Sequence, residues 1–322
     1  GADGCGHVVS LPLACSIGST ITVAGHYNFL TGRRNERNGM AVLSLSSQVA
    51  MGHVGNSATA FALRRLGHVV WDVPTTVLSF HPGHGRPEGK ALESGVVSGM
   101  IRAIICRSRP DLVFSGYLAE STNGEMLARQ LDRLREDATC RYVLDPVIGD
   151  THTGRYVPSA IVATIRDSLM PRADIVLPNR YELGVLAGMP TTTEIEVMLA
   201  ARHLMSLGPC AVVCTSSPGA PGKVHVLVVQ RESLHRVSMP AIPEAPHGTG
   251  DLFAGLFMAR MLDGMPLQNA AALAASAVHA VIGWSRALGD SDLALVAAQS
   301  SLLDPPLEAE ITLLQPRLAE IA

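Results

Sequence analysis

The stretch "HGTGDLFAGLFMARML", residues 247–262, joins a glycine-rich turn to a long apolar run. Its apolar residues recur at spacings of one, three and four, which predicts a buried helix. Asp251 would then lie at the start of the helix, where a carboxylate can cap free backbone N–H groups. Alternatively, the N–H groups of Gly248, Thr249 and Gly250 bind an anion while Asp251 accepts a proton. The second interpretation requires other ligand-binding residues elsewhere in the chain, whereas the first does not.

Strand-like and helical patterns alternate along most of the sequence. Short apolar segments predict strands at residues 41–47, 68–78, 111–117, 140–147, 173–179, 210–217 and 223–230. Helical patterns fill residues 55–67, 90–108, 122–137, 249–263, 267–284 and 291–303. This alternation predicts an α/β fold with a central, mostly parallel sheet and helices on both faces. No Pro/Ser-rich linker divides residues 40–322, which we therefore interpret as a single domain.

Residues 1–39 look different from the rest of the chain. Residues 8–24 are mildly apolar, and the polar stretch "GRRNERNG" comes after them at 32–39. A signal peptide carries its basic residues before the apolar segment, and this run is short for a membrane span. We expect Met40 to open the domain, with residues 1–39 as an extension, a tag or poorly ordered chain.

The composition excludes several classes of protein. Charged residues make up 16% of the 322 residues and hydrophobic residues 47%, which is typical of a globular chain. A net charge of −3 without a dense basic stripe argues against a nucleic-acid partner, and no membrane partner is expected. The six cysteines have no framework spacing and are interpreted as reduced thiols, which predicts a cytoplasmic protein.

Polar clusters follow most of the predicted strands. In open α/β sheets, ligands bind at the carboxyl ends of the strands. The clusters at these positions are Ser46–Ser47, the 79–89 loop, Ser115–Tyr117, Asp145–Asp150, Asn179–Glu182, Thr215–Ser216 and Gly248–Asp251. We expect them to converge on one cleft.

Several phosphate and hydrolase motifs are absent. The stretch "GHGRPEGKA" at 83–91 lacks the spacing of a phosphate-binding loop, and neither G-x-G-x-x-G after a strand nor G-x-S-x-G occurs. Asp145, Asp150 and Glu182 remain as hard oxygen donors suited to Mg²⁺. With the Gly248–Asp251 segment they fit phosphoryl transfer. Taken singly, Asp145 before a proline is equally consistent with a turn, and Glu182 with a first-turn helix charge.

Motifs in the same order along residues 40–310 carry a family resemblance. The segments "GTGDLFAG", "DPVIGD", "PNRYEL" and "CTSS" resemble the ribokinase-type fold. The segments "SSQVAMGHVGNSA", "LSFHPGHG" and "SGYL" are similar to pyridoxal kinases in particular. The resemblance implies an ATP-dependent phosphotransferase with an alcohol acceptor. Its reaction would phosphorylate the 5′-hydroxymethyl group of pyridoxal to give pyridoxal 5′-phosphate in vitamin B6 salvage, and the preference among pyridoxal, pyridoxine and pyridoxamine stays open.

The resemblance also implies a role for each matching residue. Asp251 would be the catalytic base, and Gly248, Thr249 and Gly250 would bind the γ-phosphoryl group. Mg²⁺ and the ATP phosphates would be held by Asp145, Asp150 and Glu182, with Asn179 beside them. Nucleotide contacts would come from Thr215 and Ser216, and contacts to the vitamin from Ser47, His81, Pro82 and Tyr117.

Two residues depart from the pattern of pyridoxal kinases, and two other functions remain possible interpretations of the sequence. Pro82 stands where several relatives have a threonine that contacts the substrate, and proline cannot donate that hydrogen bond. Leu177 stands where relatives can carry a threonine linked to a monovalent-cation site, which leaves activation by K⁺ open. The rivals are a hydroxymethylpyrimidine kinase of the same fold and a non-catalytic binder of pyridoxal phosphate or nucleotide. Relatives are commonly homodimers, so a homodimer is expected.

Overall fold

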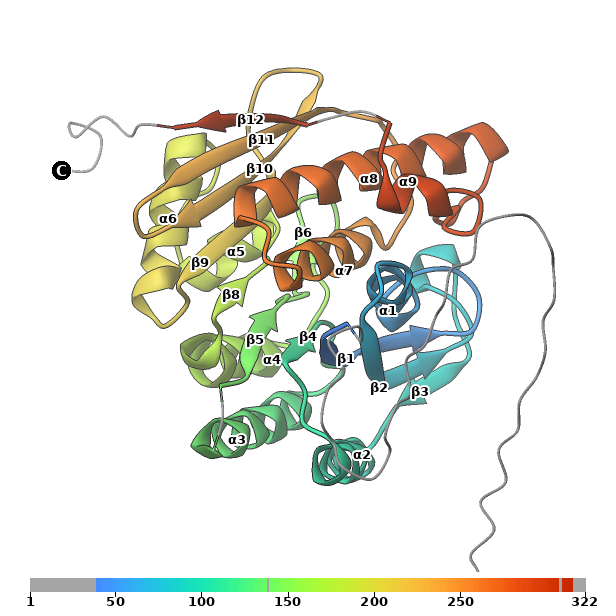
Figure 1. Cartoon of the computed structure of the whole chain (residues 1–322), viewed down its shortest axis with the longest axis vertical. Helices are drawn as coiled ribbons and strands as arrows, with labels where there is room; N and C mark the ends of the chain where they lie inside the picture. The colour runs from blue at the N-terminus through green and yellow to red at the C-terminus, as the bar shows by residue number, and fades with distance from the viewer. Residues whose placement is uncertain (1–38, 138, 307–308, 315–322) are drawn as a thin grey trace, which may run out of the picture. The chain divides into compact units, whose positions relative to one another are not determined.

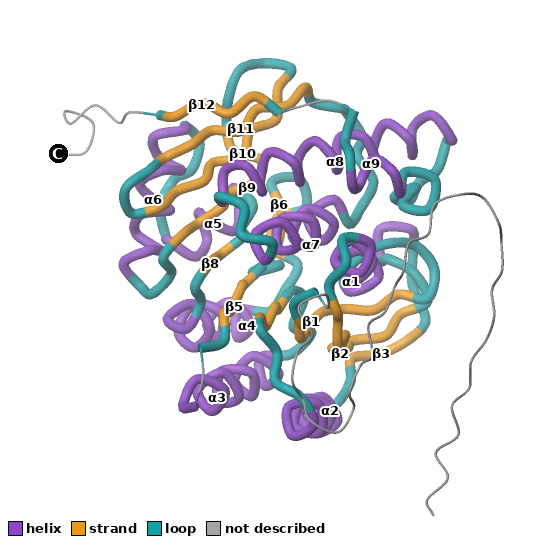
Figure 2. The backbone as a smooth tube through the Cα atoms, in the orientation of Figure 1, coloured by secondary structure: helices purple, strands orange, loops and turns teal. Residues whose placement is uncertain are grey.

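A ten-stranded sheet forms the centre of the computed structural model, which describes residues 39–137, 139–306 and 309–314 (Figures 1 and 2). Its strands are β1 (Ala41–Val49), β2 (Val69–Leu78), β3 (Gly89–Ala91), β4 (Leu112–Ser115), β5 (Arg141–Leu144), β8 (Ile175–Val176), β9 (Ala211–Ser217), β10 (Lys223–Gln230), β11 (Leu234–Pro240) and β12 (Glu310–Leu313). Their order is β12-β11-β10-β9-β8-β5-β4-β1-β2-β3. Neighbouring strands from β9 to β2 run parallel, and antiparallel strands extend both edges. The predicted α/β fold is confirmed.

Helices cover both faces of the sheet. One face carries α1 (Asn56–Arg65), α7 (Thr249–Leu262), α8 (Leu267–Leu288) and α9 (Gln299–Leu303) (Figure 1). The other carries α2 (Ser94–Arg107), α3 (Ser121–Asp137), α4 (Ser159–Thr164), α5 (Arg180–Ala187) and α6 (Glu194–Ser206). Along β4, Leu112 and Phe114 pack on the first face and Val113 on the second. Because side chains alternate along a strand, a strand buried on both faces is a continuous apolar run.

The chain departs from the expected elements at several points. The predicted helix over 291–303 is wrong in its first part, because only Gln299–Leu303 is α-helical. Asp290 Oδ1 accepts the N–H of Asp292 in a turn, and Leu293 and Leu295 are both buried in an irregular segment. Helices α5 and α6 and strands β11 and β12 were not predicted. A small hairpin of β6 (Gly149–Asp150) and β7 (Gly154–Arg155) was also missed.

Helix α8 is long and apolar enough to cross a membrane by length and composition alone. It packs against α7, β10 and β11, and several of its alanines are fully buried. The sheet and α7 therefore account for its apolar face. The four described cysteines are free thiols. The prediction for residues 1–39 falls outside the described residues, except at Gly39.

Helices α1 and α7 approach closely at Gly255. A Cβ atom on this glycine would lie 2.7 Å from the Thr59 carbonyl oxygen and 2.9 Å from Ala62 Cβ. Thr59 Oγ1 also donates a hydrogen bond of 3.0 Å to the carbonyl oxygen of Asp251. The first turn of α7 is therefore held against α1, and this contact sets the position of Asp251.

We predict that Gly255→Ala destabilises the protein by about 1–3 kcal/mol, because the added methyl group has no room against α1. The matched control is Gly283→Ala in α8, where an added Cβ meets nothing within 4 Å. That change should be neutral or stabilising by about 1 kcal/mol, since alanine is the better helix former. Urea unfolding followed by circular dichroism measures both. Equal effects of the two substitutions would contradict the close contact.

Candidate active site

The structure brings the predicted strand-end clusters to one edge of the sheet. Asn179, after β8, forms an isolated bridge with Thr215 of β9. Asp145 follows β5, and its pKa is raised by burial and then by the negative charges of Glu182 and Asp251. Three carboxyl groups from distant parts of the sequence therefore lie close together, as convergence on one cleft requires.

Asp251 does not cap α7. The N-cap residue of this helix is Gly248, and no side chain makes a capping hydrogen bond there. Burial raises the pKa of Asp251 to about 6, although a hydrogen bond from the backbone N–H of Gly55 opposes this rise. The carboxylate therefore faces the loop before α1. A carboxyl group whose pKa is shifted toward neutrality is suited to proton transfer.

The start of α7 offers backbone N–H groups beside this carboxylate. The first turn of a helix has N–H groups without intrahelical acceptors, and the helix dipole favours an anion there. Gly248 has a φ of +90°, and a Cβ on it would lie 2.2 Å from the carbonyl oxygen of His53. A Cβ on Gly250 would meet nothing within 4 Å. The turn is thus fixed on one side by close packing and open on the other, as an anion site needs.

Glu182 anchors two loops through the backbone. Its Oε1 accepts the N–H of Ile148 at 2.8 Å and of Gly149 at 3.5 Å, and its Oε2 accepts the N–H of Asn179 at 2.9 Å. Asn179 Oδ1 in turn accepts the N–H of Glu182 at 3.0 Å, which completes a capping box at α5. The side chain is buried, so burial raises its pKa while these hydrogen bonds oppose the rise. Glu182 thereby fixes the loop that follows Asp145.

Asp150 and Asn179 are also held by local contacts. Asp150 Oδ1 accepts the N–H groups of His152 and Thr153, both at 2.7 Å, and its Oδ2 accepts the Thr153 hydroxyl at 2.8 Å. Burial acts against ionisation of Asp150, but these hydrogen bonds outweigh it and lower the pKa. Asn179 Nδ2 donates to the carbonyl oxygen of Gly149 at 2.8 Å. The β6–β7 hairpin is therefore tied to α5, with an ionised Asp150 at its turn.

Two features of this edge were missed from the sequence. Tyr156 is half-exposed, yet burial of its phenol and the charges of Glu182, Asp145 and Asp251 raise its pKa. Tyr156 belongs to no sequence motif that would have identified it as a site residue. Gly55 lies in "GHVGNS", and its N–H reaches Asp251. The glycine pair after a strand was the available signal, but that pattern alone is weak.

The predicted vitamin contacts lie on β1 and the segments beside it. Strand β1 runs to Val49, so Ser47 lies within it and does not end it. Ser46 Oγ accepts the N–H of Tyr117 at 3.2 Å, and burial raises the pKa of Tyr117. His81 caps the short 3₁₀ turn η1 (Pro82–His84), with its Nδ1 accepting the N–H of Gly83 at 3.1 Å. Pro82 is exposed at the first position of this turn.

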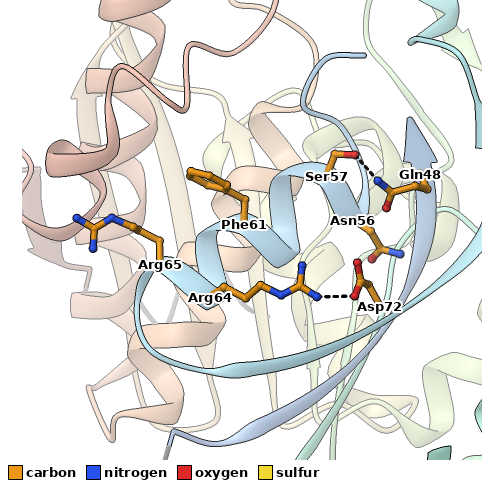
Figure 3. A pocket seen from close by; sticks show the side chains of 7 residues that line it. All are labelled: Gln48, Asn56, Ser57, Phe61, Arg64, Arg65 and Asp72. Atoms are coloured by element: carbon orange, nitrogen blue, oxygen red, sulfur yellow. Dashed lines mark hydrogen bonds and ion pairs between the residues drawn. The ribbon is translucent and has the colours of Figure 1, made fainter. Parts of the chain in front are cut away.

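A separate cavity of about 370 Å³ lies along α1 (Figure 3). Its lining residues are Gln48, Asn56, Ser57, Phe61, Arg64, Arg65 and Asp72, none of which is a predicted site residue. Arg64 points to Asp72 and forms an ion pair with it, whereas Arg65 points away (Figure 3). Gln48 donates to the Ser57 hydroxyl at 2.8 Å. The polar groups of this cavity are thus largely paired with one another.

We predict that Glu182→Ala destabilises the protein by about 3 kcal/mol, because it leaves buried backbone N–H groups without an acceptor. The matched control is Glu196→Ala, which removes the glutamate of the capping box of α6 at an exposed position. We expect a much smaller loss there. Thermal unfolding with and without MgATP compares them. A stable Glu182→Ala variant that has lost only its metal dependence would contradict the anchoring role.

Known proteins are similar to this chain in sequence over most of its length. The family model described as phosphomethylpyrimidine kinase matches residues 74–295. The pyridoxal kinase PdxY of Rubrobacter xylanophilus is 38% identical over 277 residues, which cover 84% of this chain and 96% of that protein. The pyridoxal kinase PdxY of Corynebacterium diphtheriae is 32% identical, over 84% of this chain and 99% of that protein.

Solved structures share the fold at lower identity. Pyridoxal kinase from Leishmania donovani in complex with ADP and pyridoxamine has a TM-score of 0.80 at 24% identity, covering 86% of this chain and all of that one. A putative phosphomethylpyrimidine kinase from Bacteroides thetaiotaomicron, crystallised with pyridoxal, has a TM-score of 0.76 at 23% identity, covering 86% of this chain. These likenesses confirm the predicted ribokinase-like fold.

Proposed function

The chain belongs to the phosphomethylpyrimidine kinase family, and we propose that it acts there as an ATP-dependent pyridoxal kinase. The reaction transfers the γ-phosphoryl group of ATP to the 5′-hydroxymethyl group of pyridoxal and yields pyridoxal 5′-phosphate and ADP. The curated relatives named above are pyridoxal kinases, and this chain spans nearly their whole length. The single observation that carries the chemistry is the placement of Asp251 beside the free N–H groups at the start of α7.

Asp251 is the base in this proposal. It accepts the proton of the 5′-hydroxyl as that oxygen bonds to the γ-phosphorus and the bond to the ADP oxygen breaks. Its raised pKa, about 6, keeps the carboxylate mostly ionised near neutral pH yet basic enough to take a proton. The N–H groups of Gly248, Thr249 and Gly250 bind the oxygens of the transferred group, whose negative charge they stabilise.

The nucleotide phosphates and Mg²⁺ belong on the side of Asp145. Burial and then the negative charges of Glu182 and Asp251 raise the pKa of Asp145, and this local excess of negative charge fits a divalent cation. Among the described residues, no group of three or more His, Cys, Asp or Glu side chains is arranged to hold a metal on its own. Mg²⁺ commonly takes one or two carboxylates and completes its shell with water and phosphate oxygens, and Mg²⁺ bound so would neutralise phosphate charge. Asp145 and Asp150 would hold it, with Glu182 fixing their loops.

The remaining assignments extend the proposal. Thr215 and Ser216 contact the nucleotide, and Ser216 has a φ of +55° where the pairing of β9 with β10 shifts register. Ser47, His81 and Tyr117 contact the vitamin. The protein works as a homodimer in the cytoplasm, and activation by K⁺ stays open because Leu177 offers no side-chain oxygen to a monovalent cation.

Asp251→Asn tests the proposal. We predict that it lowers pyridoxal-dependent ADP formation at least about 10²-fold, because an amide cannot accept the proton. Binding of MgATP and the melting temperature should change little, since asparagine keeps the shape of the side chain. A coupled ADP assay and calorimetric titration measure these quantities.

The same assay with hydroxymethylpyrimidine as the acceptor distinguishes a pyridoxal kinase from a hydroxymethylpyrimidine kinase. Turnover on the pyrimidine alone would overturn the choice of substrate while keeping the fold and base. Wild-type protein that binds pyridoxal phosphate or nucleotide and turns over neither alcohol would be a non-catalytic binder.

A further inference from the structure

Three histidines pack together where the loop after β2 meets the start of α7. The ring centroids of His81 and His247 lie 4.1 Å apart with 31° between their planes. His84 stands edge-on to both, at 6.4 Å from His81 and 5.9 Å from His247. From this part of the chain, the phosphoryl transfer proposed above uses only the turn after His247. It gives no role to the contact between His247 and the 79–89 loop.

The loop fits this histidine closely. A Cβ on Gly83 would lie 2.3 Å from His247 Nε2 and 2.9 Å from His81 Nδ1, so any larger residue would separate the two rings. A second contact fixes the other end of the turn, because His84 Nε2 lies 3.1 Å from Asp292 Oδ1. The turn η1 is therefore held both to the segment before α7 and to the segment after α8.

These contacts determine which nitrogen of His81 carries a proton. Its Nδ1 accepts the N–H of Gly83 and is therefore unprotonated, which places the hydrogen on Nε2. Burial, followed by the neighbouring His247 and His84, lowers the pKa of His81 to about 4, while Asp292 opposes this shift. The imidazole is neutral near pH 7. It presents one N–H donor on the side away from the turn.

We propose that His247 is a positioning residue for pyridoxal. His247 stacks on His81 and, with the His84–Asp292 pair, directs the Nε2–H of His81 toward the bound vitamin. This inference rests on the proposed function and deepens it. His247 directly precedes Gly248, whose φ of +90° begins the anion site. One contact thus fixes the loop over the vitamin relative to the turn that binds the transferred phosphoryl group.

Steady-state kinetics of His247→Ala test this inference. We expect KM for pyridoxal to rise about three- to tenfold, the range that loss of one stacked ring pair implies. The kcat and the KM for ATP should stay nearly constant, because only binding of the vitamin is weakened. His247→Phe should restore most of the lost affinity, since it keeps a ring against His81. The control is His203→Ala, which removes an exposed histidine of α6.

A loss of kcat with unchanged KM for pyridoxal would overturn the proposal, and so would a rise confined to the KM for ATP. Nitrogen-15 NMR of the imidazoles provides a readout that does not need turnover. It should find Nε2 of His81 protonated and Nδ1 unprotonated at pH 7 in the wild type. A wild type without pyridoxal turnover would overturn the proposed function, whereas His81 protonated on Nδ1 would overturn the positioning role itself.

Discussion

The crowding of Asp145, Glu182 and Asp251 at the carboxyl edge of the parallel sheet is the constraint on which the site depends. Carboxylates that are buried together are costly, because desolvation and mutual repulsion both favour the neutral form. The fold offsets this cost in two ways. Glu182 receives N–H groups from two loops, and Asp251 receives the N–H of Gly55. Burial still raises the pKa of Asp251 to about 6, despite the N–H of Gly55.

The same elements that hold these carboxyl groups also separate their tasks. Glu182 is tied to the backbone by both oxygens, so it shapes the site. Asp251 lies in the first turn of α7. Gly255 allows this helix to pack directly against α1. Asp145 follows β5, and burial and then the charges of Glu182 and Asp251 raise its pKa. In the proposed mechanism, a rigid sheet edge, a helix start and a capping box give chemically similar residues separate anchoring, base and charge-bearing roles.

Much of this arrangement could be predicted from the sequence because the strands are buried on both faces. Apolar runs such as "DLVFSGY" locate the sheet, and polar residues at their ends locate the site. Asp251 was found because a charge before a buried helix is conspicuous. The kinase family was then indicated by motifs that lie in order over most of the chain.

What could not be predicted depends on contacts between distant segments. Residues 291–298 contain helix-forming residues but turn irregularly, since both Leu293 and Leu295 insert into the core. Contacts with other loops determine the roles of three groups: the N–H of Gly55, the phenol of Tyr156 and the ring of His247. The local periodicity of the sequence does not predict contacts between distant segments. The sequence also left Asp251 undecided between cap and base, and in the structure no side chain caps α7 while Asp251 lies beside Gly55.

The most direct test of the account is the pH dependence of kcat/KM for pyridoxal with MgATP saturating. If burial raises the pKa of Asp251 to about 6, activity should rise through a single inflection near that pH as the carboxylate loses its proton. The residual activity of Asp251→Asn should lack this inflection. An inflection near the ordinary value of an aspartate, about 4, would contradict the central claim that burial tunes this carboxylate. So would an unchanged inflection in the variant.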